Sequence, residues 1–360
     1  MRSPHIVRAP LPVARPSAGP DSVGPYVIER PLGAGGMGRV YQARHSLTEA
    51  PVALKILDGQ VDELATTRFL REVRAASRIG HPDVVQVLDA GQTDRGELFI
   101  VMELLEGETL CDLVEEANAL DAGLRPLLRA LPALAAAHRA GFVHRDLKPE
   151  NLFVLSDGSV KLLDFGIALD LNPGTMRTGN VLGTPHYMSP EQVRHPSLVA
   201  PASDVWAVGV MLYEILAGVL PFDGETASGV VVTLCTDAHV PLNKRRPKLD
   251  PGLVAIVERC LCKDPAERYS DAEALLAVLS PWMHGAPTEP TAGEGLEAGR
   301  DSLEGRPTQE FRRRRWPVRR AAWVAASVTV VAVAWPVHSA VVEREVALPA
   351  QHVSGNLPLP

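Results

Sequence analysis

Cysteine is scarce in this chain of 360 residues, and its four cysteines are too few for a disulfide framework. Cys260 and Cys262 lie two positions apart in an apolar helical pattern, where such residues point to different faces, so we expect ordinary thiols. The formal net charge of −7 shows no excess of basic residues, which excludes a nucleic-acid footprint over the chain as a whole. The first 25 residues contain six prolines and no long apolar run, so we expect no secretory signal peptide.

Short β-type runs come first along the chain, and helical patterns follow from about Leu110 to Trp282. This order predicts an α+β fold with a small β-rich lobe followed by a large helical lobe. We expect five segments, which are a disordered leader (1–25), one two-lobed domain (26–283), a flexible linker ending in a basic run (284–320), an apolar helix (321–342) and a short tail (343–360).

A glycine-rich stretch, Gly33-Ala34-Gly35-Gly36-Met37-Gly38, lies between two predicted strands, and Val40 follows it. Glycines allow backbone amides to approach phosphate oxygens, although glycine-rich hairpins are common in proteins without any ligand. A strand rather than a helix follows, so this is not a dinucleotide fingerprint. Lys55 ends the next apolar strand, and Glu72 lies on the following helix. Taken alone, Lys55 would be an exposed edge charge and Glu72 a solvated helix residue.

Three oxygen-bearing side chains, Asp146, Asn151 and Asp164, follow at short intervals, with Lys148 between the first two. Such a set is poorly suited to a hydrophobic core. Asn151 and Asp164 supply hard oxygen ligands for a divalent metal bound against phosphate. One carboxylate could accept a hydroxyl proton, a role that the family resemblance described below gives to Asp146, and Lys148 can neutralise a transferring phosphoryl group. Each residue alone would read as a turn cap or a solvated loop residue, but together they predict phosphoryl transfer.

The stretches His144–Asn151, Asp164–Gly166 and Gly183–Glu191 resemble the catalytic, metal and substrate-docking loops of eukaryotic-like (Hanks-type) protein kinases. The resemblance covers residues 26–283 and is strongest to bacterial members. It implies a two-lobed protein kinase fold and transfer of the γ-phosphate of ATP to serine or threonine hydroxyls of proteins. Mg²⁺ would be the metal, with Mn²⁺ as a substitute.

The resemblance also assigns residue roles. Lys55 would contact the α- and β-phosphates, held by an ion pair with Glu72. Thr184 would hydrogen-bond the catalytic aspartate and lysine. The expected nucleotide contacts are Gly33, Ala34, Gly35, Gly36, Met37, Gly38, Val40, Lys55, Glu103 and Leu105.

Two further features follow from the same resemblance. Arg145 precedes the catalytic aspartate, and kinases with this arginine often need a phosphorylated activation segment, so Thr175 and Thr178 are candidate autophosphorylation sites. Self-association would allow this phosphorylation in trans. Glu191 and Arg268 are expected to form a partly buried, structural ion pair.

The C-terminal part contains an uncharged run of 22 residues, 321–342, which follows six arginines within 312–320. As a helix this run is about long enough to span a membrane core of about 30 Å. The arginine bias would leave the kinase domain in the cytoplasm at the inner membrane. A peripheral amphipathic segment, a buried helix and a wholly cytoplasmic protein are the alternatives.

Two other functions remain to be weighed. A pseudokinase scaffold usually lacks the equivalents of Lys55, Asp146 or Asp164, and all three are present here. A small-molecule phosphotransferase is disfavoured by the full docking loop through Glu191. We therefore expect an active protein serine/threonine kinase that acts on protein substrates, associates with a membrane and does not bind nucleic acid.

Overall fold

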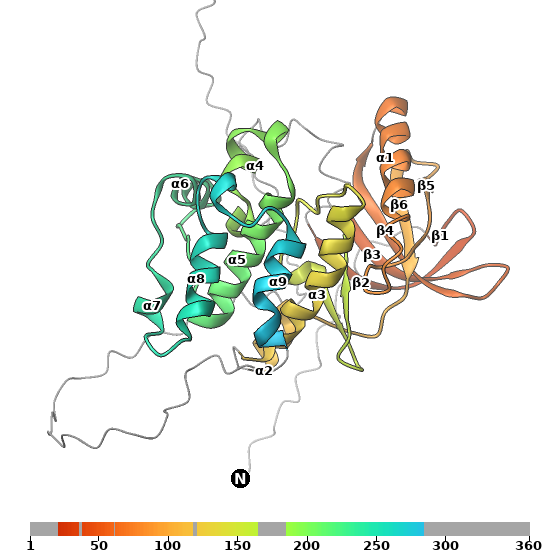
Figure 1. Ribbon diagram of the computed structural model, residues 1–360. Helices are drawn as coiled ribbons and strands as arrows, with labels where there is room; N and C mark the ends of the chain where they lie inside the picture. The colour runs from red at the N-terminus through yellow and green to blue at the C-terminus, as the bar shows by residue number, and fades with distance from the viewer. Residues whose placement is uncertain (1–20, 36–37, 61, 118–120, 165–184, 284–360) are drawn as a thin grey trace, which may run out of the picture. The chain divides into compact units, whose positions relative to one another are not determined.

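The computed structural model describes residues 21–35, 38–60, 62–117, 121–164 and 185–283 (Figure 1). The first part of the chain forms a six-stranded antiparallel sheet in the order β1-β2-β3-β4-β6-β5. Its strands are β1 (Ser22–Val23), β2 (Tyr26–Gly35), β3 (Gly38–His45), β4 (Pro51–Gln60), β5 (Val87–Gln92) and β6 (Glu97–Glu103). This sheet is the small, N-terminal lobe.

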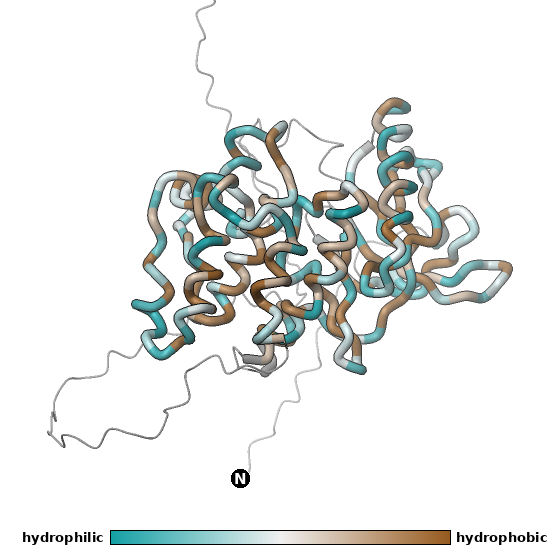
Figure 2. Tube along the Cα trace, in the orientation of Figure 1, coloured by the Kyte–Doolittle hydropathy of each residue, from teal (hydrophilic) through white to brown (hydrophobic). Residues whose placement is uncertain are grey.

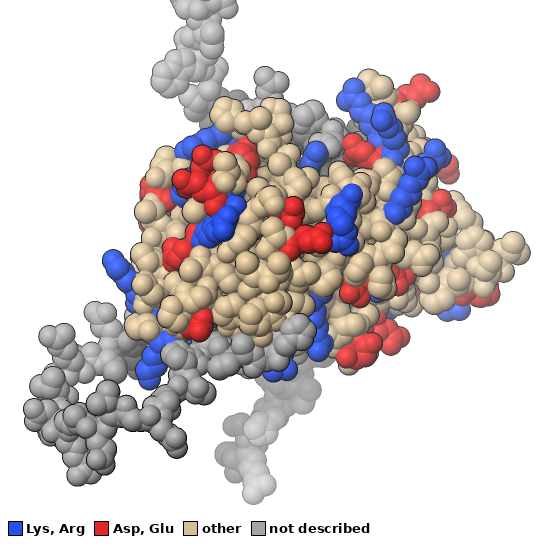
Figure 3. All heavy atoms as spheres, in the orientation of Figure 1, with Lys and Arg blue, Asp and Glu red and all other residues tan. Residues whose placement is uncertain are grey.

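Helix α1 (Glu63–Ala76) covers one face of this sheet. The Asp62 carboxylate accepts the N–H of Ala65 and thereby caps the first turn. Phe69 and Val73 are one helical turn apart, so both point toward the sheet and pack against its apolar residues. The opposite side of α1 carries exposed arginines, and Lys and Arg side chains gather over this helix in Figure 3.

The larger lobe begins with a three-stranded sheet in the order β7-β8-β9, formed by β7 (Gly107–Thr109), β8 (Leu152–Leu155) and β9 (Val160–Leu162). Its helices are α2 (Leu110–Ala117), α3 (Asp121–Arg139), α4 (Pro190–Arg194), α5 (Pro201–Ala217), α6 (Ala227–Thr236), α7 (Leu242–Arg245), α8 (Pro251–Cys260) and α9 (Ala272–Met283). Short 3₁₀ turns lie at Pro149–Asn151, Pro185–Tyr187, Pro196–Leu198 and Pro265–Glu267.

Helix α5 is the centre of the large lobe. Every residue from Ala202 to Leu216 is buried, because α3, α8 and α9 pack around it. Figure 2 shows apolar segments along these helices and polar segments at the turns that join them. Because the large lobe encloses α5 on all sides, the residues at its N-terminal end, including the buried Asp204, have a fixed position.

The C-terminal segment that was predicted to cross a membrane, 321–342, lies outside the described residues. Within the part of the chain that the structure describes, no helix is both long and apolar enough to span a bilayer.

Candidate active site

Asp204, at the start of α5, holds the backbone of the loop between α3 and β8. Its buried carboxylate accepts the N–H of His144 at 2.7 Å and the N–H of Arg145 at 2.9 Å. His138 accepts the N–H of Ala272 at Nδ1, so its Nε2 carries the proton that it donates to the same carboxylate. Arg145 has a φ of +66°, a costly conformation for a non-glycine residue. The bonds to Asp204 keep the loop in this conformation.

The next residues of this loop bring three predicted catalytic and metal-binding side chains together. Lys148 Nζ donates to Asp146 Oδ2 at 2.8 Å. Asn151 Nδ2 donates to the backbone carbonyl of Asp146 at 2.6 Å and to its Oδ2 at 3.2 Å. Burial lowers the pKa of Lys148, but the neighbouring Asp146 carboxylate outweighs burial and raises it, so the lysine stays charged at neutral pH. A base, a cation and an amide oxygen thus share one rigid turn.

Asp164 follows β9 in the large lobe and has a φ of +49°. Its Oδ2 accepts a hydrogen bond from Lys55 Nζ of β4 at 2.7 Å. Burial raises the pKa of this carboxyl, but the nearby ammonium of Lys55 outweighs burial and the net pKa is lowered. Asp164 is therefore an anion at neutral pH, as a metal ligand must be.

The structure describes an ion pair of Lys55 with Asp164, whereas the resemblance implied one with Glu72. Glu72 is half-buried on α1 and has an interaction of its own. The ion pair that the structure describes for Lys55 joins it to the large lobe, and the role expected for Glu72 stays a prediction.

The glycine-rich stretch forms the β2–β3 hairpin, with Gly33, Ala34 and Gly35 on β2 and Gly38 at the start of β3. Gly36 and Met37 lie outside the described residues. At Gly38, φ is +141° and a Cβ atom would come within 2.1 Å of the Ile56 carbonyl oxygen, so no larger residue fits. Val40 lies directly opposite Lys55 in the β3–β4 register. The hairpin is thereby aligned with the lysine.

The protein kinase domain family matches this chain over residues 26–283. This chain belongs to the protein kinase domain family. It is 42% identical over 269 residues to serine/threonine-protein kinase pkn3 of Myxococcus xanthus, an alignment that covers 71% of this chain and 49% of that protein. It is 41% identical over 265 residues to serine/threonine-protein kinase PknL of Mycobacterium tuberculosis, with 71% of this chain and 64% of that protein covered. The chain therefore spans less than two thirds of the length of these curated relatives.

The solved kinase domain of PknI from Mycobacterium tuberculosis has the same fold. It is 27% identical to this chain, with a TM-score of 0.58 over 74% of this chain and 98% of that domain. These matches confirm the resemblance to bacterial eukaryotic-like kinases and the prediction of a kinase fold with a β-rich and a helical lobe.

The apolar cluster that α1 covers also contains one of the predicted nucleotide contacts. Ala53, Met102 and Leu163 belong to one cluster of buried and partly buried apolar residues, together with the predicted contact Leu105. The carboxylate of Glu103 points elsewhere and bonds Lys161 and Gln86, so only its backbone remains for a nucleotide. Ala53 lies two positions before Lys55 on β4, so the two residues lie on the same face of the strand. This spacing is the sequence signal that could have identified Ala53.

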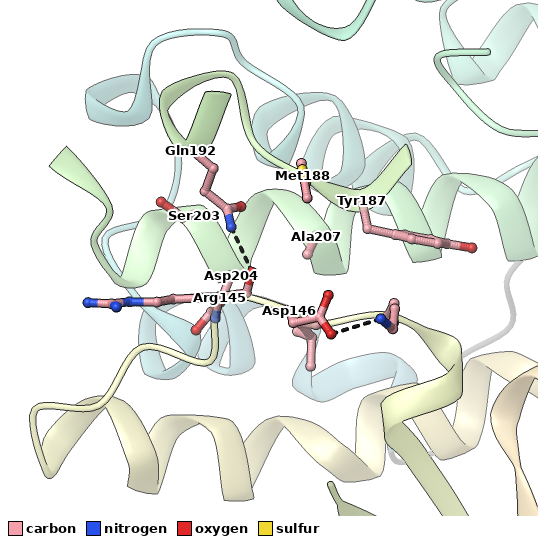
Figure 4. A pocket seen from close by; sticks show the side chains of 10 residues that line it. Arg145, Asp146, Tyr187, Met188, Gln192, Ser203, Asp204 and Ala207 are labelled. Carbon is pink, nitrogen blue, oxygen red and sulfur yellow. Dashed lines mark hydrogen bonds and ion pairs between the residues drawn. The ribbon is translucent and has the colours of Figure 1, made fainter. Parts of the chain in front are cut away.

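A small pocket lies beside Asp146. It is lined by the catalytic loop on one side and by Tyr187 and Met188 on the other, as Figure 4 shows. Gln192 of α4 donates to the Arg145 carbonyl at 2.7 Å and links the two sides. Thr184, the threonine expected to contact Asp146, lies outside the described residues, and so do Thr175 and Thr178.

The predicted ion pair between Glu191 and Arg268 is confirmed and lies within the large lobe, below this pocket. The guanidinium forms two hydrogen bonds to the Glu191 carboxylate, at 2.7 and 2.9 Å, and Arg268 is 3% exposed. Burial raises the pKa of Glu191, but the guanidinium outweighs burial and lowers it. Ser203 also donates to this carboxylate, so its charge is fully compensated.

Glu214 of α5 is predicted to make stability depend on pH. Burial raises the pKa of this carboxyl from 4.5 to about 7, and the Tyr187 hydroxyl donates to it at 2.7 Å. Between these two values the folded state keeps a proton that the unfolded chain has lost, so the free energy of unfolding falls as pH rises through this range.

Replacement of Glu214 by Gln keeps an acceptor for Tyr187 and removes the titration. Urea unfolding of both proteins at about pH 5 and about pH 8 should therefore show a smaller loss of stability for Glu214→Gln than for the wild type. An equal loss in both would contradict the assignment.

Proposed function

We propose that this chain is an ATP-dependent protein serine/threonine kinase that uses Mg²⁺. The observation that carries the proposal is that Asp146, Lys148 and Asn151 are joined by hydrogen bonds in the large lobe, while Asp164 of the same lobe binds Lys55 of the small lobe. The relatives pkn3 and PknL are named serine/threonine-protein kinases and support it.

The residues present fit a divalent metal held between protein and triphosphate. The amide nitrogen of Asn151 is used by Asp146, which leaves its Oδ1 as the acceptor atom. Asp164 binds Lys55 through one carboxylate oxygen and remains an anion. Mg²⁺ usually takes one or two protein oxygens and completes its shell with phosphate and water. The metal would neutralise charge on the triphosphate.

The protein side chains would then do the following work. Asp146 would accept the proton of a serine or threonine hydroxyl as that oxygen bonds to the γ-phosphorus, while the bond from the γ-phosphorus to the β–γ bridging oxygen breaks and ADP leaves. Lys148, held beside Asp146 at 2.8 Å, offers positive charge to the transferring group. Lys55 is placed opposite Val40 of the glycine hairpin, where it can reach phosphate oxygens. Tyr187 and Met188, which line a small pocket beside Asp146, would flank the substrate chain next to the phosphorylated residue.

The regulation and location of the kinase are also proposals. Autophosphorylation of Thr175 or Thr178, in trans between two copies, is supported by Arg145, which precedes the catalytic aspartate on a constrained backbone. Attachment to the inner membrane through 321–342, with the kinase domain in the cytoplasm, is supported by the uncharged run and the six arginines before it. Extraction with alkaline carbonate tests the second proposal, since release of the full chain from membranes would refute a span.

Purified full-length protein tests the activity. Incubation with ATP, Mg²⁺ and a generic protein acceptor should produce phosphoserine or phosphothreonine that mass spectrometry detects. Chelation by EDTA should abolish the product, and added Mg²⁺ or Mn²⁺ should restore it. A protein that binds ATP but transfers no phosphate, either to itself or to the acceptor, would refute the proposal.

A further inference from the structure

Glu103 ends β6, the strand from which the chain leaves the small lobe, and its carboxylate connects both lobes. Oε1 accepts the backbone N–H of Gln86, in the small lobe, at 2.8 Å. The same oxygen accepts Lys161 Nζ, on β9 of the large lobe, at 2.7 Å. We refer to Gln86, Glu103 and Lys161 as the hinge clamp.

The hinge clamp replaces an ordinary backbone bond. The N–H of Glu103 donates to the Gln86 carbonyl at 3.0 Å, as in an antiparallel ladder. The reciprocal bond would run from the Gln86 N–H to the Glu103 carbonyl, but that N–H donates to the carboxylate instead. The Glu103 side chain therefore ends the backbone ladder, because it takes the Gln86 N–H that the Glu103 carbonyl would otherwise accept.

The ion pair of the clamp is more enclosed than a typical surface pair. The side chains of Lys161 and Glu103 are 17% and 27% exposed. In the pair between Arg139 and Glu273, on the outside of the large lobe, the corresponding values are 59% and 62%. An enclosed charged hydrogen bond is screened less by water and salt, so the clamp should contribute measurably to the geometry of the hinge.

The clamp lies between the two halves of the nucleotide site. Residues 103–105 lead out of β6, and Leu105 shares an apolar cluster with Leu163. Lys161 lies three positions before Asp164 on the chain. Backbone bonds reinforce this link, because the N–H of Val85 donates to the Leu162 carbonyl at 3.0 Å and the N–H of Leu162 donates to the Asp83 carbonyl at 2.7 Å.

We propose that Lys161 and Glu103 act as positioning residues that set the hinge for nucleotide binding, holding the adenine side of the site in register with Asp164. The inference rests on the proposed kinase function. The clamp does not touch the phosphoryl group, so its loss should weaken the affinity for ATP and leave the chemical step unchanged.

Steady-state kinetics of the full-length protein test this role. Lys161→Met keeps the aliphatic stem and removes the charge, and we expect its KM for ATP to rise about fivefold to tenfold with kcat within about twofold of wild type. Glu103→Gln should raise KM for ATP by a similar factor. The double variant should have a KM no higher than that of either single variant, because all three lose the same Lys161–Glu103 ion pair. Lys161→Arg keeps the charge and should restore most of the affinity.

Arg139→Met, which breaks an exposed ion pair within the large lobe, is the matched control and should change neither constant. Thermal unfolding checks that each variant is folded. If Lys161→Met does not fold, Glu103→Gln provides the test. An unchanged KM for ATP in the folded variants, or a fall in kcat alone, would refute the proposed positioning role of Lys161 and Glu103.

A fluorescent ATP analogue separates this inference from the proposed function. If the wild type transfers no phosphate, the kinase proposal fails. The clamp is then judged by the Kd of the analogue, which should still rise in Lys161→Met and not in Arg139→Met. An equal Kd in wild type and Lys161→Met would overturn the clamp by itself.

Discussion

Asp146→Asn is expected to lower kcat for phosphate transfer by roughly 10²–10⁴-fold, the usual effect of removing a general base. The amide cannot accept the hydroxyl proton, but its oxygen can still accept the hydrogen bonds from Lys148 and Asn151, which are 2.8 and 3.2 Å from the carboxylate in the wild type. The loop should keep its shape, because Asp204 holds it through the backbone of His144 and Arg145.

Two measurements separate loss of chemistry from loss of structure. The Kd for ATP and the thermal unfolding temperature should stay close to the wild-type values in Asp146→Asn. Asp94→Asn, which removes an exposed carboxylate in the turn between β5 and β6, is the matched control and should leave kcat unchanged. Full activity in Asp146→Asn would refute the role of Asp146 as the base.

Arg268→Ala is expected to destabilise the protein by about 3–5 kcal/mol, the usual cost of stranding one charge of a buried pair. Arg268 donates two hydrogen bonds to Glu191 and others to the carbonyls of Ala202, Cys262 and Lys263. Its removal leaves the Glu191 carboxylate and these carbonyls without their partner inside the large lobe.

Urea unfolding of the full-length protein measures this effect. Arg139→Ala breaks the exposed pair with Glu273 and should cost less than about 1 kcal/mol. Replacement of both partners, as in Glu191→Gln with Arg268→Met, should cost less than the sum of the single changes, because no buried charge is left alone. If Arg268→Ala costs no more than Arg139→Ala, the pair has no structural role.

Much of the site could be predicted from the sequence because its residues act over short chain distances. Asp146, Lys148 and Asn151 lie within one turn, and the structure joins them by direct hydrogen bonds. A loop of this length leaves few ways to arrange three polar side chains, so residue types and spacing were enough. The order of strands and helices likewise indicated the two lobes, because each element carries its own hydrophobic period.

The amino-acid sequence by itself placed a carboxylate, a lysine and two further oxygen-bearing side chains in adjoining loops, which is the set of groups that the proposed phosphoryl transfer needs. Only the tertiary structure decided which distant groups meet. It paired Lys55 with Asp164, 109 positions away, and it joined Glu103 to Lys161 across the lobes. It also placed His138 and Asp204 behind the catalytic loop. Contacts of this kind depend on how the lobes and helices pack, and no local pattern in the chain encodes that packing.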